Sequence, residues 1–275
     1  MNAPAPVAHV ASAEPILLRQ DTDGIAILTL NRPQARNALS EAMLSALGEA
    51  FTAIAADRAV RAVILQANGP AFSAGHDMKE LTARRSDADR GRAYFKQIMD
   101  ACSAMMQMVV RLPQPVIAAV EGVASAAGCQ LVASCDLAVA TQESRFQTPG
   151  VHIGLFCSTP MVALSRNVAR KHAMEMLLTG DMMSADDAQR IGLVNRVVAQ
   201  GKAREEAMAM ARKIASKSAA IIKIGKEAFY RQIEMDLADA YAYAAQVMTE
   251  NMMARDAEEG IGAFIEKREP RWEDR

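Results

Sequence analysis

The chain has 275 residues, of which 51% are hydrophobic and 23% are charged, a composition typical of a globular protein. Its formal net charge of −1 offers no general attraction to nucleic acid or to an anionic membrane, so neither is predicted as a partner. An anionic ligand would have to be held by local Lys or Arg side chains.

The amino-terminal residues 1–14 are rich in Ala and Pro and contain no Lys or Arg. A signal peptide needs a basic start and a mitochondrial presequence needs Arg, so we expect a disordered tail and a cytoplasmic protein. No apolar run approaches the roughly 20 residues that a membrane-spanning helix needs. The four cysteines form no C-x-x-C pair and the four histidines are scattered, so no metal site is predicted.

The first predicted element is a β-hairpin, in which two apolar runs, PILLRQ and GIAILTL, flank the turn-like DTDG. Ser40 can then cap a helix with apolar residues on one face. These residues are Leu44, Leu47, Phe51 and Ile54. Buried strands are expected at residues 61–67 and 115–122, with a long helix over residues 86–112 between them.

Helices dominate from about residue 158 onward. Ser184, followed by two Asp residues, is expected to cap one of them, and residues 200–217, 219–234 and 236–267 are all expected to be helical. Strands that alternate with helices before a purely helical end predict an α/β core over residues 15–199 and a helical region over residues 200–275. The apolar stripe of the last helix belongs either to the core or to an interface between subunits.

Two loops that follow strands share one design. AFSAGHD and GVASAAGCQ are both built from small residues, which let a ligand approach the backbone. The second loop opens a helix, whose amino-terminal dipole favours negative charge. If the loops lie side by side, their N–H groups can converge on one oxygen, where each donor is worth about 10²–10³ in rate. Two ordinary strand-to-helix turns are the alternative.

Five separated segments carry a more specific resemblance. In chain order they are LNRPQARNALS, AFSAGHDMKEL, PVIAAVEGVASAAGCQLVASCDLAVAT, MEMLLTGDMMSADDAQRIGLVNRVV and EGIGAFIEKREP. From about residue 15 to the carboxyl terminus, the chain resembles the enoyl-CoA hydratase/isomerase (crotonase) superfamily. AGHD, TPGV and GLFCSTP also resemble a narrower group, the enoyl-CoA hydratase domain-containing protein three group.

The resemblance implies a crotonase-type spiral of ββα units with a C-terminal helical trimerisation region, in a homotrimer or homohexamer. It implies that the ligand is an acyl-CoA thioester, with coenzyme A entering as part of the substrate and no separate cofactor. It also implies that two backbone N–H groups stabilise the enolate of the thioester.

The same resemblance assigns roles to particular residues. The two N–H donors look like His76, after SAG, and Ala127, in SAAG, where the family usually places Gly. The strip that follows the pantetheine and adenine looks like His76, Asp77, Met78 and Lys79. Three cations are candidate partners of the coenzyme phosphates, although a solvated surface charge is the alternative for each. They are Arg36, Lys79 and Lys267, the last reaching a phosphate in its own or a neighbouring subunit.

Gln130 and Gly150 stand where hydratases of the family carry their two catalytic glutamates. Glutamine can orient a water molecule but cannot accept its proton, and glycine offers only its backbone. General acid and base groups each contribute about 10²–10⁴ in rate. We therefore expect the hydratase activity, a lyase reaction of fatty acid metabolism, to be weak or absent.

Several alternatives stay open on the sequence. The imidazole of His76 or of His152 could carry protons in place of the glutamates. Cys129 is expected to be a buried, inert thiol. The protein could be a non-catalytic acyl-CoA binder, or could catalyse hydrolysis or decarboxylation of a thioester. No G-x-G-x-x-G follows the first strand and no P-loop is present, which argues against dinucleotide and nucleoside triphosphate chemistry.

Overall fold

The computed structural model describes residues 14–275, so the predicted disordered tail lies outside the described residues except for Glu14. The main sheet has six strands in the order β1-β2-β3-β5-β7-β10. They are β1 (Leu17–Thr22), β2 (Ile25–Leu30), β3 (Ala62–Ala67), β5 (Val116–Val120), β7 (Leu137–Thr141) and β10 (Arg196–Val198). Strands β1 and β2 form the predicted antiparallel hairpin, and the other pairs are parallel.

A second, smaller sheet has the order β4-β6-β8-β9. Its strands are β4 (Ala71–Ser73), β6 (Val123–Ser125), β8 (Arg145–Gln147) and β9 (Met183–Ser184). Each of the first three follows a strand of the main sheet and precedes a helical turn, so the chain repeats a ββα unit. Because β4 and β6 are parallel neighbours, the loops that leave their carboxyl ends lie together.

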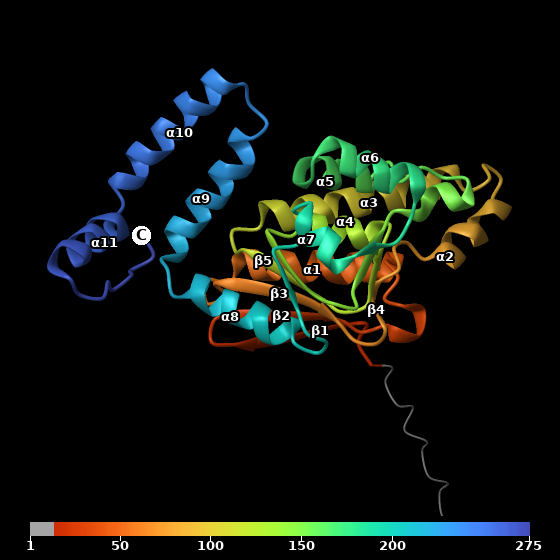
Figure 1. Ribbon diagram of the computed structural model, residues 1–275, viewed down its shortest axis with the longest axis horizontal. Helices are drawn as coiled ribbons and strands as arrows, with labels where there is room; N and C mark the ends of the chain where they lie inside the picture. Colours follow the sequence, from red (N-terminus) through yellow and green to blue (C-terminus); the bar gives the residue numbers. More distant parts are fainter. Residues whose placement is uncertain (1–13) are drawn as a thin grey trace, which may run out of the picture.

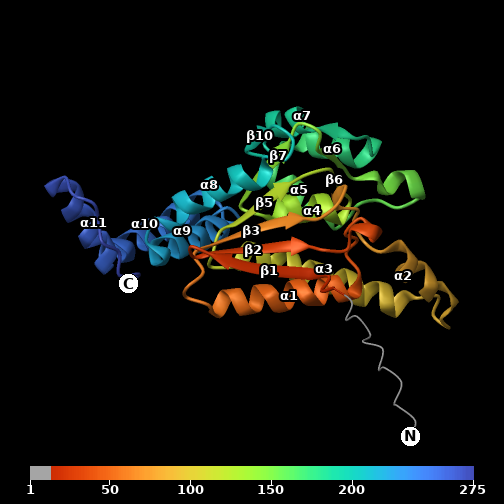
Figure 2. The same ribbon diagram turned by 90° about the horizontal axis from the view of Figure 1, so that it is seen from below.

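Helices cover both faces of the main sheet (Figure 2). On one face lie α1 (Glu41–Ala56) and α3 (Arg92–Arg111), and on the other lies α8 (Ala203–Ala215). All six residues of β2 are consequently buried, as in a parallel sheet covered on both sides. Helix α1 begins as predicted, because Ser40 Oγ accepts a hydrogen bond from Met43 N at 3.2 Å.

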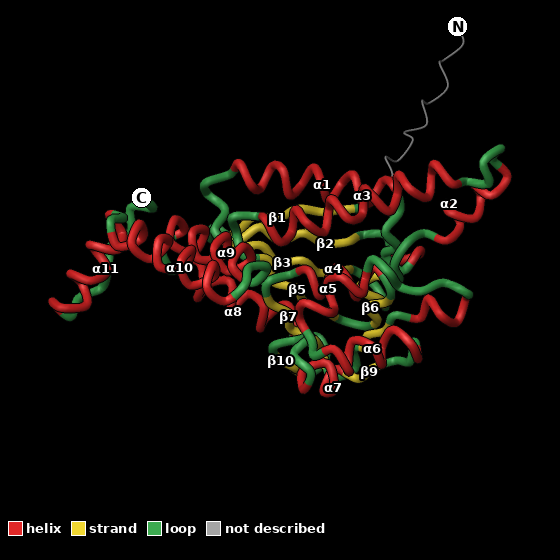
Figure 3. Tube along the Cα trace, turned by 90° about the horizontal axis from the view of Figure 1, so that it is seen from above, coloured by secondary structure: helices red, strands yellow, loops and turns green. Residues whose placement is uncertain are grey.

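Of the remaining elements of the body, α2 (Met78–Ala83) projects at the end opposite the carboxyl-terminal helices (Figure 3). The others are α4 (Ala127–Ser134), α5 (Pro160–Asn167), α6 (Arg170–Thr179), α7 (Ala185–Arg190) and the 3₁₀ turns η1 (Pro33–Ala35), η2 (Arg84–Ser86) and η3 (Pro149–Ile153). Ser184 caps α7 as predicted, with its Oγ 3.1 Å from Asp187 N. The long helix expected over residues 86–112 begins later, at Arg92.

Three helices form an arm, residues 219–275, that extends from the body (Figure 1). They are α9 (Ala219–Gln232), α10 (Leu237–Met252) and α11 (Arg255–Glu266), so the single helix expected over residues 236–267 is two helices. Neither α9 nor α10 has a buried residue. By contrast α8 packs on the sheet through Ala203, Ala207 and Ala211, so the arm starts after it.

Several polar contacts attach the arm to the body, among them an exposed ion pair between Arg166 in α5 and Glu234. On α9, Lys226 Nζ lies 2.7 Å from Asp136 Oδ2, and Tyr230 OH donates to Asp136 Oδ1 at 3.0 Å. At the chain end, Asp274 pairs with Arg61 at 2.8 Å and accepts the N–H of Ala219.

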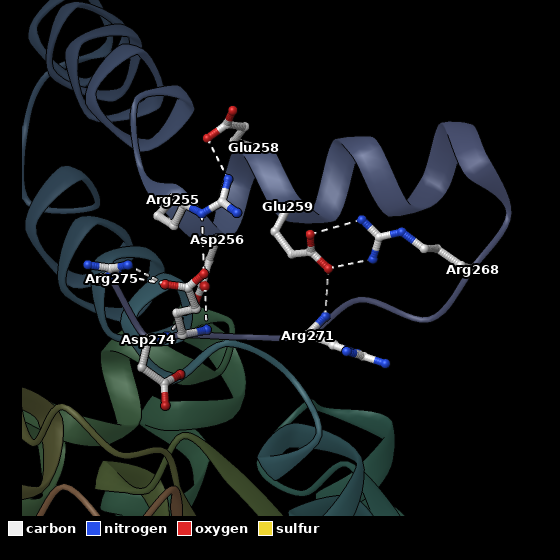
Figure 4. Close-up of polar contacts among 9 residues, drawn as sticks. Arg255, Asp256, Glu258, Glu259, Arg268, Arg271, Asp274 and Arg275 are labelled. Atoms are coloured by element: carbon white, nitrogen blue, oxygen red, sulfur yellow. Dashed lines mark hydrogen bonds and ion pairs between the residues drawn. The ribbon is translucent and has the colours of Figure 1, made fainter.

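Around α11 the chain end is held in place by further contacts (Figure 4). The buried carboxylate of Asp256 accepts the N–H groups of Glu273 and Asp274, and Glu259 pairs with Arg268. No helix within residues 14–275 combines the length and the apolar composition needed to cross a membrane.

Candidate functional site

The two loops singled out in the sequence meet at the carboxyl ends of β4 and β6. A Cβ built on Gly75 would lie 3.2 Å from the N atom of Ala127, so the residue before His76 touches the second proposed donor. Gly128 allows this approach, because a Cβ there would lie 2.3 Å from the carbonyl oxygen of Ser73 in β4. The structure therefore brings the backbones of His76 and Ala127 together.

Both proposed donors have a free N–H. Within residues 14–275, neither His76 N nor Ala127 N donates a hydrogen bond to a protein acceptor. The parallel bridge between Leu39 and His76 uses the carbonyl of Gly75, which accepts Leu39 N at 2.7 Å, and so leaves the N–H of His76 unused. Ala127 is the first residue of α4, where an amide has no partner inside the helix. Two adjacent, unused N–H groups can both donate to one ligand oxygen.

The backbone of Ala127 is not in a left-handed conformation, so alanine is acceptable in place of the usual glycine. The positive φ falls instead on the preceding residue, Ala126, with φ 50° and ψ −117°. This combination lies outside the regions that L-residues normally occupy. The sequence offered no sign of it, because the residue is not a glycine.

The imidazole of His76 is partly buried, and both of its ring nitrogens are shielded from solvent. Within the described part of the chain, neither Nδ1 nor Nε2 has a hydrogen-bond partner. Burial lowers the pKa of this imidazole, only partly opposed by the nearby backbone of Leu39. A buried polar group without a hydrogen-bond partner typically lowers folding stability by about 1–3 kcal/mol. The unpartnered ring nitrogens of His76 are therefore unfavourable for stability.

The strip after His76 has one engaged and two exposed side chains. Asp77 caps α2, accepting Lys79 N at 3.0 Å, and pairs with Arg32 NH1 at 2.9 Å. Although burial alone raises the pKa of Asp77, its hydrogen bonds from Arg32 and from backbone amides hold that pKa below its usual value. Met78 and Lys79 are exposed, as is Arg36, whose carbonyl accepts Ala74 N at 3.0 Å.

Gln130 lies in the first turn of α4, three residues after Ala127. Its side chain is only 4% exposed, and Oε1 has no hydrogen-bond partner among the described residues. Helical side chains lean toward the amino terminus, so the side chain of Gln130 is directed toward the first turn of α4, which begins at Ala127. The group at the first glutamate position is therefore a neutral amide with an unused acceptor.

Gly150, at the second glutamate position, is buried inside a tight turn. Leu155 N donates to the carbonyl of Gly150 at 2.9 Å, which folds the chain back over this residue. A Cβ at residue 150 would lie 2.9 Å from both Cys157 Sγ and Leu155 O. Thus protein atoms fill the space in which a side chain would begin.

The other candidates lie apart from the two donors or are inert. His152 is exposed, and its Nε2 lies 2.9 Å from the carbonyl oxygen of Thr179. Burial raises the pKa of Cys129 to about 12, which keeps this thiol protonated at neutral pH. Lys267 ends α11 in the arm, whereas α2 lies at the opposite end of the molecule (Figures 1 and 2). A single chain therefore does not bring Lys267 to the two donors.

Two polar contacts near these elements were not foreseen from the sequence. Arg32 and Asp77 are 45 positions apart, and Lys226 and Asp136 are 90 positions apart. A hollow of about 630 Å³ lies on the arm and is lined mainly by charged residues, several of which Figure 4 shows. Its lining residues are Arg255, Glu259, Arg268, Glu269, Pro270, Arg271 and Glu273.

The chain matches a known protein family and individual members of it. The family model described as enoyl-CoA hydratase/isomerase matches residues 20–275. A rat protein named enoyl-CoA hydratase domain-containing protein 3, mitochondrial, is 48% identical over 250 residues, which cover 91% of this chain and 82% of the relative. The resemblance to the superfamily and to its narrower group is confirmed.

Solved structures agree with this assignment. An enoyl-CoA hydratase from Mycobacterium smegmatis superposes with a TM-score of 0.89 at 56% identity, covering 94% of this chain and 99% of that one. Human enoyl Coenzyme A hydratase domain-containing protein 3 gives 0.89 at 47% identity, covering 94% and 100%. The predicted crotonase-type spiral with C-terminal helices is confirmed.

The predicted cytoplasmic localisation is contradicted. The rat relative and the corresponding human and mouse proteins are all named as mitochondrial. The prediction rested only on the lack of Lys and Arg in residues 1–14, which is weaker than the names of relatives that match over nine-tenths of the chain.

Proposed function

The chain belongs to the enoyl-CoA hydratase/isomerase family, and on this premise we propose that it binds acyl-CoA thioesters with little or no hydratase activity. The thioester carbonyl oxygen accepts hydrogen bonds from the N–H groups of His76 and Ala127. Coenzyme A enters as part of the ligand, with no resident cofactor.

The observation that carries this proposal is the state of the two amides. They come from separate loops, they are adjacent through Gly75, and within residues 14–275 neither is used by the protein itself. Preorganised backbone donors of this kind stabilise an oxyanion more than a neutral carbonyl, because hydrogen bonds to charged acceptors are stronger. The amino-terminal dipole of α4 adds to the same preference.

The proposed weakness as a hydratase follows from proton transfer. Adding water to a 2-enoyl thioester needs a base for the water and an acid for the second carbon. Gln130 cannot accept a proton, and Gly150 has no side chain and no room for one. The imidazole of His76 is the remaining candidate acid or base near the donors, and its catalytic role stays a prediction.

A non-catalytic acyl-CoA binder is the second candidate. It is favoured by the same turn at Gly150, in which main-chain atoms and Cys157 occupy the place of a catalytic group. His76→Ala separates the two candidates, since it removes the imidazole but keeps the N–H. A catalyst that uses the imidazole loses turnover in this variant, whereas a binder keeps its affinity.

We propose further that the protein assembles as a homotrimer or homohexamer through the arm. Large apolar side chains on the arm are exposed in the single chain, including Leu237 at 75% and Phe264 at 84%. Exposed apolar surface on this scale is typical of an interaction site. In such an assembly Lys267, at the end of α11 in the arm, would approach a coenzyme phosphate bound by another subunit.

Two measurements on the purified protein test the proposal. Butyryl-CoA at 100 times its dissociation constant should stabilise the fold by about 2.7 kcal/mol. Crotonyl-CoA, followed by the absorbance of its conjugated thioester, should be hydrated far more slowly than the ordinary range of about 1–10³ s⁻¹. Turnover within that range contradicts the proposed weakness, and absence of any stabilisation contradicts acyl-CoA binding. A panel with malonyl-CoA and 3-hydroxybutyryl-CoA detects decarboxylation or hydrolysis instead.

A further inference from the structure

Each proposed donor follows a residue in an unusual backbone conformation. Gly75, before His76, has φ +89°, and Ala126, before Ala127, has φ 50° with ψ −117°. The direction of an N–H is set by the dihedrals of the residue before it, since the peptide unit is planar. These two residues therefore aim the two donors.

The two residues also touch each other. A Cβ built on Gly75 would lie 3.0 Å from the Cβ of Ala126 and 3.0 Å from the carbonyl oxygen of Ser125. The methyl group of Ala126 thus lies beside Gly75, on the side where that residue lacks a side chain.

Hydrogen bonds hold both residues in place. Ala126 N donates to Gln147 O at 2.9 Å, and Ala126 O accepts Gln130 N at 3.0 Å. Gly75 O accepts Leu39 N at 2.7 Å, and Gly75 N lies 3.3 Å from Ser73 Oγ. The conformation of Ala126 is consequently imposed by its surroundings, which is the condition under which a strained residue persists.

Alanine is an unfavourable choice for this conformation, because glycine adopts positive φ without a steric penalty. The only thing that alanine adds is the methyl group that contacts Gly75. We propose that Ala126 is a positioning residue, whose methyl group keeps the N–H of Ala127 and the N–H of His76 pointing at the same oxygen position. The inference rests on the proposed function, since it concerns the same two donors.

Ala126→Gly tests this inference with two readouts of opposite sign. Relief of backbone strain should raise the midpoint of thermal unfolding by roughly 2–4 °C. Loss of the methyl group should lower the fraction of bound acetoacetyl-CoA present as the enolate, read from its absorbance, about tenfold. Affinity for butyryl-CoA should change less than threefold, because a neutral carbonyl depends less on donor alignment than an enolate oxygen.

Gly75→Ala approaches the same contact from the other side. The added Cβ meets the methyl group of Ala126, so the variant should lose the enolate signal, and Ala126→Gly in the same chain should restore part of it. Gly201→Ala is the matched control: residue 201 has φ +75° but nothing within 4 Å of an added Cβ. It should lower the thermal midpoint and leave the enolate signal unchanged.

The outcomes separate this inference from the proposed function. Wild-type protein that fails to bind butyryl-CoA overturns both. Wild-type binding combined with an unchanged enolate fraction in Ala126→Gly overturns the positioning role alone. A parallel fall of thermal midpoint and enolate fraction also overturns it, because that pattern indicates a purely structural residue.

Discussion

Cys157 lies against Gly150 so closely that a Cβ at residue 150 would come within 2.9 Å of its Sγ atom. The carbonyl oxygen of Leu155 is equally near, and Leu155 N is bonded to the carbonyl of Gly150. The turn at Gly150 therefore leaves no room for the side chain of a glutamate. A single substitution at residue 150 therefore cannot restore a catalytic carboxylate without moving the turn.

Gly150→Glu should destabilise the fold. Forcing extra atoms into a packed site typically costs about 1–3 kcal/mol, and the buried carboxylate adds to this. Urea unfolding measures the loss, with Gly48→Glu in α1 as the control, because residue 48 has no positive φ and an added Cβ there meets nothing within 4 Å. A Gly150→Glu variant as stable as the wild type would show that the turn opens without penalty.

Gln130→Glu should raise the hydration of crotonyl-CoA. The new carboxylate is directed toward the first turn of α4 and supplies one of the two missing acid–base groups, so a gain of about 10²-fold is expected. Gln130→Met, which has similar size and no carboxylate, should show no gain. Equal rates in the two variants would mean that residue 130 does not face the acyl group.

Lys226→Met should lower the free energy of unfolding by about 3–5 kcal/mol, because it leaves the carboxylate of Asp136 buried without its cation. The side chains of this pair are only 7% and 15% exposed. Lys223→Met on the exposed side of the same helix should change stability by less than about 0.5 kcal/mol. Equal effects from both lysines would show that the pair does not attach the arm.

Arg32→Leu should make the protein more sensitive to acid. Because Arg32 helps to hold the pKa of Asp77 below 3.8, the ionised form of Asp77 stabilises the fold above that pH. The contribution is lost as the pH falls through the lowered pKa of the folded state. Without Arg32, that loss should begin at a higher pH, which acid titration of the unfolding free energy measures. An unchanged acid limb would rule out the contribution of this pair.

The elements that the sequence predicted well depend on local signals. Ser40 and Ser184 cap helices because a hydroxyl can bond the backbone N–H three residues later, and the pattern is visible in the chain. The hairpin of β1 and β2 and the two small-residue loops were also predicted from local sequence patterns. The proximity of the two loops followed from the parallel pairing of β4 with β6.

What could not be predicted depends either on backbone conformations that no residue type indicates or on contacts between distant segments. The strain at Ala126 has no sequence signal, because alanine, unlike glycine, gives no indication of a positive φ. The filled space at Gly150 depends on the path of residues 150–157, and the pair of Lys226 with Asp136 joins segments 90 positions apart. The break near Met253 that divides the last predicted helix has no proline or glycine to mark it.

The most direct test of the proposed function is the infrared band of the thioester carbonyl in bound butyryl-CoA, identified by ¹³C labelling at that carbon. Two hydrogen bonds from His76 N and Ala127 N should weaken the C=O bond and move the band to lower wavenumber than in solution. Butyryl-CoA that saturates the protein while its carbonyl band stays at the solution position would contradict binding of the carbonyl by these two amides.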